Sequence, residues 1–218
     1  MYKHVIFDMD GTLIDSFWGI CRAYQYAFSQ MGHPFPGKDF VKKAIGAPLT
    51  YALEALAGVE EKEIPAFLRL YRGYYEEHGK KECSLYPGIR DCLWRLRQAG
   101  CLLGTATLKK ESFAVDILKE QNILSCMDAV CGINENDCLH KRDLILNCMD
   151  QLGGAPWETL LVGDSIFDAE GAAEAGIAFL AVTYGFGFQE KKSLDRYPTV
   201  GKAEHPKEIA DILLEKGR

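Results

Sequence analysis

The stretch KHVIFDMDGTLIDS (residues 3–16) places two carboxylates two positions apart, directly after a short apolar run. The run over residues 3–7 is rich in Val, Ile and Phe and predicts a buried β-strand. Because side chains alternate along a strand, Asp8 and Asp10 are expected to point to one side and Met9 to the other. A buried carboxylate without a partner is costly, so these acids predict either a capped turn or a chemical role.

The composition is that of an ordinary globular protein, with 218 residues, 48% of them apolar and 26% charged. A net charge of −6 without a Lys/Arg-rich run argues against nucleic acid or an anionic membrane as a partner. The N-terminal segment does not have the pattern of a leader peptide, and a cytoplasmic protein is expected. The eight cysteines contain no C-x-x-C pair and predict reduced core residues, with disulfides or structural zinc as alternatives. The sequence leaves monomer and homodimer open.

Strand and helix patterns alternate over much of the chain, which predicts an α/β fold with a mostly parallel sheet and helices on both faces. The expected strands are 3–7, 101–106, 128–132, 159–163 and 177–182, and the helices between the later strands are 88–99, 111–121 and 140–152. Counting these strands along the chain, we expect the spatial order 5-4-1-2-3, with strand 1 in the centre.

The segment between the first two strands has no strand pattern and predicts helices instead, at 16–31, 38–45, 48–57 and 63–78. We therefore expect two domains: an α/β core formed by residues 1–15 and 83–218, and a helical cap formed by residues 16–82. Such an insert would lie over the carboxyl end of the first strand. Open α/β sheets bind ligands at that edge, so the cap is expected to act as a lid.

Three other strand ends carry polar residues that suit the same edge. Thr107 ends the second strand, where a hydroxyl suits a phosphate, although a helix-entry role is the alternative. Lys141 opens a helix against its macrodipole, which implies an anionic partner unless the side chain is simply exposed. Asp164 and Asp168 follow the fourth strand with Ser165 as an expected N-cap, and dipole complementation is their alternative role.

The summed charge of these acids favours a metal site. Asp8, Asp10, Asp164 and Asp168 together carry four negative charges. Like charges ~4 Å apart repel by ~4 kcal/mol per pair at an effective dielectric constant of about 20. An ammonium group from Lys141 and a Mg²⁺ ion, which prefers oxygen ligands, would neutralise most of that charge. The sequence therefore predicts Mg²⁺ as a cofactor.

Four motifs in this order resemble those of the haloacid dehalogenase-like (HAD) phosphatases: DMDGT (8–12), Thr107 in ATLK, Lys141 in HKRD, and GDSIFD (163–168). The resemblance covers nearly the whole chain. It implies a Rossmann-like HAD core, and the helical insert is similar to the C1 cap of the subgroup with phosphoglycolate phosphatases, β-phosphoglucomutases and 5′-nucleotidase-like phosphatases.

The resemblance also implies a role for each site residue. Asp8 would be the nucleophile that forms an aspartyl-phosphate, and Asp10 the general acid and base. Thr107 and Lys141 would hold the transferred phosphoryl group.

The implied metal ligands are the carboxylates of Asp8 and Asp164 and the backbone carbonyl of Asp10. Asp168 would support the metal or orient Lys141. An Asp carboxylate is ionised at neutral pH, so Asp8 would need positioning more than activation.

The resemblance implies a Mg²⁺-dependent hydrolase of small phosphate esters, similar to phosphoglycolate phosphatase, with a 5′-nucleotidase-like enzyme as the alternative. The stretch AIGAPLTYALEAL (44–56) resembles the nucleotidase branch, but Ala47 departs from its usual G-P-P-L. A phosphomutase and a non-catalytic phosphate-binding regulator remain as further alternatives, whereas Asp10 disfavours a dehalogenase. A second anionic group of the substrate would meet cationic residues of the cap, for which the candidates are Lys42, Lys43, Arg69 and Arg72.

Overall fold

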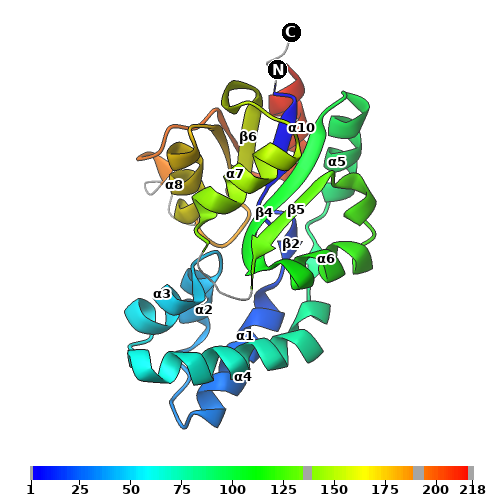
Figure 1. Ribbon diagram of the computed structural model, residues 1–218. Coiled ribbons are helices and arrows are strands. Elements are labelled where there is room, and N and C mark those ends of the chain that lie inside the picture. The colour runs from blue at the N-terminus through cyan, green and yellow to red at the C-terminus, as the bar shows by residue number, and fades with distance from the viewer. Residues whose placement is uncertain (1, 135–138, 189–193, 216–218) are drawn as a thin grey trace.

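A six-stranded parallel sheet forms the centre of the protein, which a computed structural model describes for residues 2–134, 139–188 and 194–215. The spatial order is β5-β4-β1-β6-β7-β8, and every neighbouring pair is parallel. The strands are β1 (His4–Phe7), β4 (Leu102–Lys110), β5 (Ala129–Ile133), β6 (Thr159–Gly163), β7 (Ala178–Val182) and β8 (Gly201–Ala203). The predicted α/β class, the five strands and their order are confirmed, with β1 inside the sheet (Figure 1).

Three features of the strands differ from the prediction. Strand β4 continues to Lys110, four residues beyond its expected end, and its register with β5 shifts between Ala106 and Lys110. Strand β8 and the antiparallel ribbon of β2 (Ile14–Asp15) and β3 (Ser84–Leu85) were not predicted. These elements have three residues or two, which is too short for a periodic pattern.

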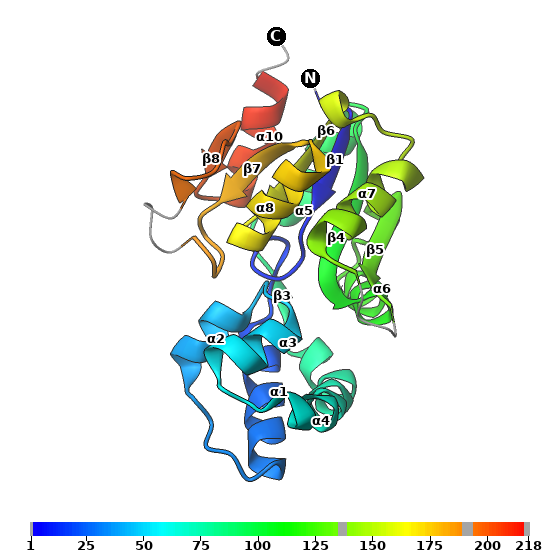
Figure 2. The ribbon, with the colours of Figure 1, turned by 60° about the vertical axis from the view of Figure 1, so that its left-hand side comes forward.

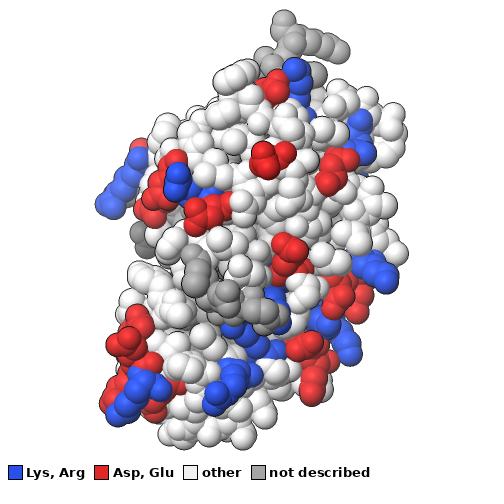
Figure 3. Space-filling view, viewed as in Figure 1, with Lys and Arg blue, Asp and Glu red and all other residues white. Residues whose placement is uncertain are grey.

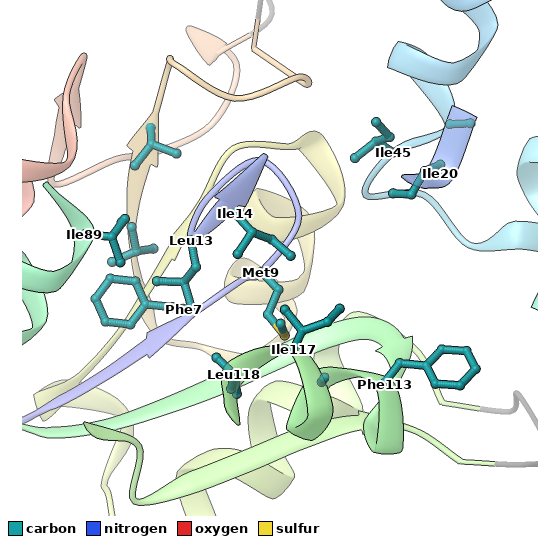
Figure 4. Packing of buried hydrophobic residues seen from close by; sticks show 14 of the residues in the cluster. Phe7, Met9, Leu13, Ile14, Ile20, Ile45, Ile89, Phe113, Ile117 and Leu118 are labelled. Carbon is teal, nitrogen blue, oxygen red and sulfur yellow. The ribbon is translucent and has the colours of Figure 1, made fainter. Parts of the chain in front are cut away.

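Helices cover both faces of the sheet, as predicted (Figures 1 and 2). Residues of α5 (Ile89–Gln98), α6 (Glu111–Glu120) and α10 (Pro206–Glu215) share a hydrophobic cluster with Val5 and Phe7. Ile6 instead joins the cluster formed with α7 (Lys141–Gln151) and α8 (Ile166–Ala175). The alternation of β1 side chains between two apolar layers explains why the strand is apolar at nearly every position. Figure 4 shows Phe7 and Met9 within the first cluster.

Helices α1 (Phe17–Gln30), α2 (Lys38–Ala44), α3 (Leu49–Tyr51) and α4 (Ile64–Glu77) form a separate layer beyond the sheet, and a π-helical turn, Ala52–Leu56, continues α3. Figures 1 and 2 show them beneath the β2–β3 ribbon, at the opposite end of the molecule from α10 (Pro206–Glu215). We call residues 16–82 the cap segment. Its interior is aromatic: the rings of Tyr24 and Tyr71 lie 4.7 Å apart, as do those of Phe28 and Phe67. These four rings are buried and pack in the interior of the cap segment.

Charged side chains of both signs are scattered over the face of the molecule seen in Figure 3. Across the described ranges, no helix is long and apolar enough to span a lipid bilayer.

Two helical glycines of the cap segment differ in their surroundings, and we expect opposite effects of alanine. A Cβ at Gly19 in α1 would lie 2.1 Å from the carbonyl oxygen of Gly79, whereas a Cβ at Gly73 in α4 would meet nothing within 4 Å. Gly19→Ala should lower the free energy of unfolding by about 1–3 kcal/mol through overpacking. Gly73→Ala should raise it by about 0.5–1 kcal/mol through helix propensity. Urea denaturation measures both, and a Gly19→Ala protein as stable as the wild type would contradict this packing.

Candidate active site

The turn after β1 brings two carboxylates to the carboxyl edge of the sheet. Asp8 continues the strand, because its backbone N–H donates to the carbonyl of Val162 at 2.9 Å. Gly11 turns the chain with φ of 84°, and a Cβ there would lie 2.2 Å from Oδ2 of Asp164. Glycine is therefore required at position 11 for two reasons: the left-handed backbone conformation and the close approach of Asp164.

Asp164 is held by backbone amides. Its Oδ2 accepts hydrogen bonds from the N–H groups of Phe186 at 2.7 Å and Gly187 at 3.1 Å. Its Oδ1 lies 3.4 Å from the hydroxyl of Thr12. These three donors hold the carboxylate beside Gly11, at the junction of β6 and α8.

Asp168 lies in the first turn of α8, which Ser165 caps as predicted. Oδ2 of Asp168 accepts from the N–H of Ser165 at 3.0 Å and from its hydroxyl at 2.7 Å. A Cβ at Gly163 would lie 2.5 Å from the Cβ and Cγ atoms of Asp168, so the small residue lets the carboxylate approach the strand. The capping arrangement fixes one oxygen of Asp168 and leaves the other to face Lys141.

Lys141 reaches across the site from the first turn of α7. Its Nζ lies 2.5 Å from Oδ1 of Asp8 and 2.7 Å from Oδ1 of Asp168, and it donates to the carbonyl of Ala106 at 2.7 Å. The residue is 6% exposed, which excludes the solvent-exposed alternative. The anionic partner that the sequence implied for Lys141 is thus a pair of aspartates.

Burial and mutual repulsion make these carboxylates hard to ionise. Burial raises the pKa of Asp8, and the charge of Lys141 partly offsets this rise. Burial likewise raises the pKa of Asp164, and the charges of Asp168 and Asp8 raise it further. Burial lowers the pKa of Lys141, but attraction to Asp168 and Asp8 outweighs this effect and raises the pKa overall. An additional cation near Asp8 and Asp164 would favour the ionised forms of both carboxylates.

The carboxylates of Asp8, Asp164 and Asp168 fit such a cation. One oxygen of each lies within 4.8 Å of the others, and all three residues are buried. Oδ2 of Asp8 is buried without a hydrogen-bond partner among the described residues. Oxygen donors of this kind suit Mg²⁺. The carboxylate of Asp10 lies outside this group.

The irregular part of β4 presents Thr107 and Lys109 to the same edge. Thr107 is 1% exposed, and its Oγ1 accepts from the N–H of Lys109 at 3.2 Å. Lys109 was not predicted as a site residue, yet its Nζ lies 3.1 Å from Oδ2 of Asp10. Its position two residues after Thr107, on the same side of a strand, is the signal that could have identified it. Bulged strands often redirect side chains in this way.

Lys109 changes the charge balance expected from the sequence. The site holds four carboxylates and two buried ammonium groups, those of Lys141 and Lys109. With every group ionised, two negative charges remain uncompensated. One divalent cation would balance them.

A narrow cavity lies between this edge and the cap segment, with a volume of about 60 Å³. It is lined from the sheet by Asp8, Asp10, Thr107 and Lys109, and from the cap segment by residues that include Tyr24, Ile45, Arg72 and Tyr75. The volume is well below the 300–1,000 Å³ typical of pockets for larger ligands. In this arrangement the cavity admits only a small group.

The four cationic residues of the cap segment that were predicted as candidates for binding a second anionic group do not lie at one site. Arg72 lines the narrow cavity, whereas Lys42 and Lys43 line a second cleft of about 540 Å³. That cleft lies between the cap segment and the start of α8, where the rings of Tyr51 and Phe167 meet edge to face at 5.7 Å. Arg69 lines neither of these spaces.

Residues 5–182 match the family model described as haloacid dehalogenase-like hydrolase. Over 184 residues the chain is 35% identical to the tyrosine-protein kinase PtkA of Mycobacterium tuberculosis, a match covering 84% of this chain but only 62% of that relative. It is 31% identical to a 5′-nucleotidase of Pseudomonas aeruginosa, and that match covers 87% of this chain and 86% of the relative. It is 29% identical to a phosphoglycolate phosphatase of Shigella dysenteriae, and that match covers 89% of this chain and 86% of the relative.

The fold also has counterparts among solved structures. A haloacid dehalogenase-like hydrolase from Streptococcus pneumoniae superposes with a TM-score of 0.89 at 32% identity, covering 100% of this chain and 99% of the other. The likeness therefore extends over the sheet and the cap segment together.

Removing the ammonium group of Lys141 should destabilise the protein, because Asp8 and Asp168 would lose their buried partner. We expect Lys141→Met to lower the free energy of unfolding by about 3–5 kcal/mol without divalent cations. Lys202→Met is a matched control: Lys202 pairs with Asp195 at 3.1 Å on the exposed surface, and its loss should cost about 0–1 kcal/mol.

The loss in Lys141→Met should depend on pH. A carboxyl group whose pKa is raised in the folded state is destabilising when ionised, so its penalty decreases as the pH falls below that pKa. The difference between Lys141→Met and wild type should therefore be smaller at pH 5.5 than at pH 8. Denaturation at both pH values measures this, and an equal or larger loss at pH 5.5 would contradict the buried pairing.

Proposed function

The chain belongs to the haloacid dehalogenase-like hydrolase family, and on this basis we propose that it is a Mg²⁺-dependent phosphomonoesterase acting through an aspartyl-phosphate. The carboxylate of Asp8 is the observation that carries this proposal. It is buried at the cavity, Lys141 binds its Oδ1, and its Oδ2 has no partner among the described residues. Relatives named phosphoglycolate phosphatase and 5′-nucleotidase support it.

In the proposed reaction, an oxygen of Asp8 attacks phosphorus and the bond to the alcohol oxygen breaks. Asp10 donates a proton to the departing oxygen, and in the second step removes a proton from the water that hydrolyses the aspartyl-phosphate. Lys141 and Thr107 bind the phosphoryl oxygens, since phosphoryl transfer depends mainly on positioning and charge neutralisation. Asp8, Asp10 and Thr107 line the narrow cavity and Lys141 contacts Asp8, which supports the assignment.

We propose that the carboxylates of Asp8 and Asp164 and the backbone carbonyl of Asp10 hold Mg²⁺. When bound, the ion supplies positive charge next to the phosphoryl oxygens. Asp168 already uses Oδ1 for Lys141 and Oδ2 for Ser165, which favours an orienting role for Asp168 over direct ligation.

The substrate is proposed to be a small phosphorylated metabolite of the phosphoglycolate kind. The narrow cavity and the presence of Arg72 in its wall suit a short leaving group with a second anionic charge. A nucleoside monophosphate is the second candidate. The wider cleft favours it, because an aromatic base could contact Tyr51 and Phe167 while Lys42 and Lys43 lie nearby.

A panel of esters tests the activity: phosphoglycolate, nucleoside monophosphates, sugar phosphates and pyridoxal phosphate, each with Mg²⁺. We expect phosphate release from a short-chain ester and a loss of at least about 10³-fold in kcat for Asp8→Asn. Asp150→Asn, an acid in α7 outside the site, serves as the control and should retain activity. A folded wild-type protein that hydrolyses none of the esters would instead indicate a phosphate-binding regulator.

Metal dependence is tested by chelation. EDTA should abolish phosphate release, and Mg²⁺ should restore it. Because Mg²⁺ would bind only the folded site, saturation at 100 times its dissociation constant should also stabilise the protein by about 2.7 kcal/mol. Thermal unfolding measures this gain, and Asp164→Asn should lose most of it. Full activity in EDTA, with Tm unaffected by Mg²⁺, would refute the metal assignment.

A further inference from the structure

Lys109 connects the cap segment to Asp10. Its Nζ lies 3.1 Å from Oδ2 of Asp10, which is in the turn after β1. The same Nζ donates a hydrogen bond to the hydroxyl of Tyr75 in α4 at 2.7 Å. The ammonium also lies 4.3 Å from the centre of the Tyr75 ring. The Lys109 side chain is only 6% exposed. The ammonium group of Lys109 thus contacts both Asp10 at the edge of the sheet and Tyr75 of the cap segment.

The two oxygens of Asp10 have different environments. Oδ2 is bound by Lys109, whereas Oδ1 is buried with no hydrogen-bond partner in the described parts of the chain. Asp10 lines the narrow cavity. A carboxylate held through one oxygen cannot rotate freely, so the contact with Lys109 fixes the direction of the other oxygen.

The Tyr75 ring is itself fixed. It stacks on Tyr71 with ring centres 6.0 Å apart and an interplanar angle of 7°, and the ring of Phe113 from α6 lies 5.8 Å away. Gly79 packs against its edge so closely that a Cβ there would lie 2.6 Å from Cδ2. Tyr75 is 2% exposed. Its hydroxyl therefore follows α4, and if the cap segment moves away from the sheet, the bond to Lys109 breaks.

We propose that Lys109 and Tyr75 form a clasp that positions the Asp10 carboxylate for proton transfer only while the cap segment rests on the core. The inference rests on the proposed phosphomonoesterase function and assigns both as positioning residues, acting through Asp10. The clasp makes proton transfer to the leaving group depend on closure of the cavity. Its alternative is a direct role, in which Lys109 binds a second anionic group of the substrate.

Two phosphate compounds of similar size distinguish these roles: ethyl phosphate, an ester, and acetyl phosphate, an acyl phosphate. Ethyl phosphate releases a strongly basic alkoxide unless its oxygen is protonated, whereas acetyl phosphate releases acetate, which needs no proton. Neither carries an anionic group besides its phosphate. Loss of a positioned acid should therefore affect ethyl phosphate selectively, while loss of a subsite for a second anion should affect neither compound.

We expect Lys109→Met and Tyr75→Phe to lower kcat/KM for ethyl phosphate at least about 10-fold and for acetyl phosphate less than about 3-fold. Asp10→Asn should show the same selectivity with a larger loss. Adding Lys109→Met to Asp10→Asn should cause little further loss on ethyl phosphate, since the clasp acts through Asp10. The controls are Tyr74→Phe, whose ring stacks on Tyr26 at 5.0 Å, and Lys119→Met in α6.

Equal losses of kcat/KM for ethyl phosphate and acetyl phosphate, or no loss for either compound, would overturn the positioning role. A second measurement does not depend on catalysis: hydrogen exchange of β2 and β3, which join the cap segment to the sheet. Both clasp variants should speed this exchange, and Tyr74→Phe should not; unchanged exchange would overturn the clasp. A wild-type protein without esterase activity would refute the proposed function, and the exchange would still decide whether the clasp exists.

Discussion

The convergence of three buried aspartates, two of them paired with one lysine, is the constraint on which the rest of the structure depends. Asp8, Asp164 and Asp168 lie within a few ångströms of one another, and Lys141 bonds two of them. Taking such charges out of water costs several kcal/mol per ion, and only close pairing offsets this. Glycines at the edge, Gly163 beside Asp168 among them, leave the space for that pairing. The large apolar layers on both faces of the sheet stabilise the fold and offset the free-energy cost of burying these charged groups.

The same edge explains why the helical insert follows β1. The acids leave the sheet where parallel strands end, and the chain must cover them to exclude water from the cavity. The β2–β3 ribbon carries the chain out and back, so the cap segment is attached to the sheet by two short strands. Contacts between the two parts then decide how the cavity is closed. Lys109 supplies one such contact because the register shift in β4 alters how residues 107–109 are presented.

Much of this arrangement is local and could be predicted from the sequence. The apolar runs identified β1, β4 and β6, and the ends of these runs placed Asp8, Thr107 and Asp164 at one edge. Other features depend on tertiary contacts. The amides that bind Asp164 come from residues 186 and 187, and backbone N–H groups leave no trace in the residue types. Lys109 was overlooked because the strand was expected to end at residue 106, which made residues 107–110 a helix entry.

The charge balance links metal binding, cap closure and chemistry. The four carboxylates, when ionised, exceed the two ammonium groups of Lys141 and Lys109 by two negative charges, which one divalent cation would balance. Each ammonium group serves a different acid: Lys141 holds the carboxylate of Asp8, and Lys109 holds that of Asp10. Within the described parts of the chain, the bonds of Lys141 are to residues of the sheet and its helices, whereas Lys109 also bonds Tyr75 of the cap segment. The carboxylate of Asp8 is therefore held by the core, and that of Asp10 is connected through Lys109 to the core and the cap segment together.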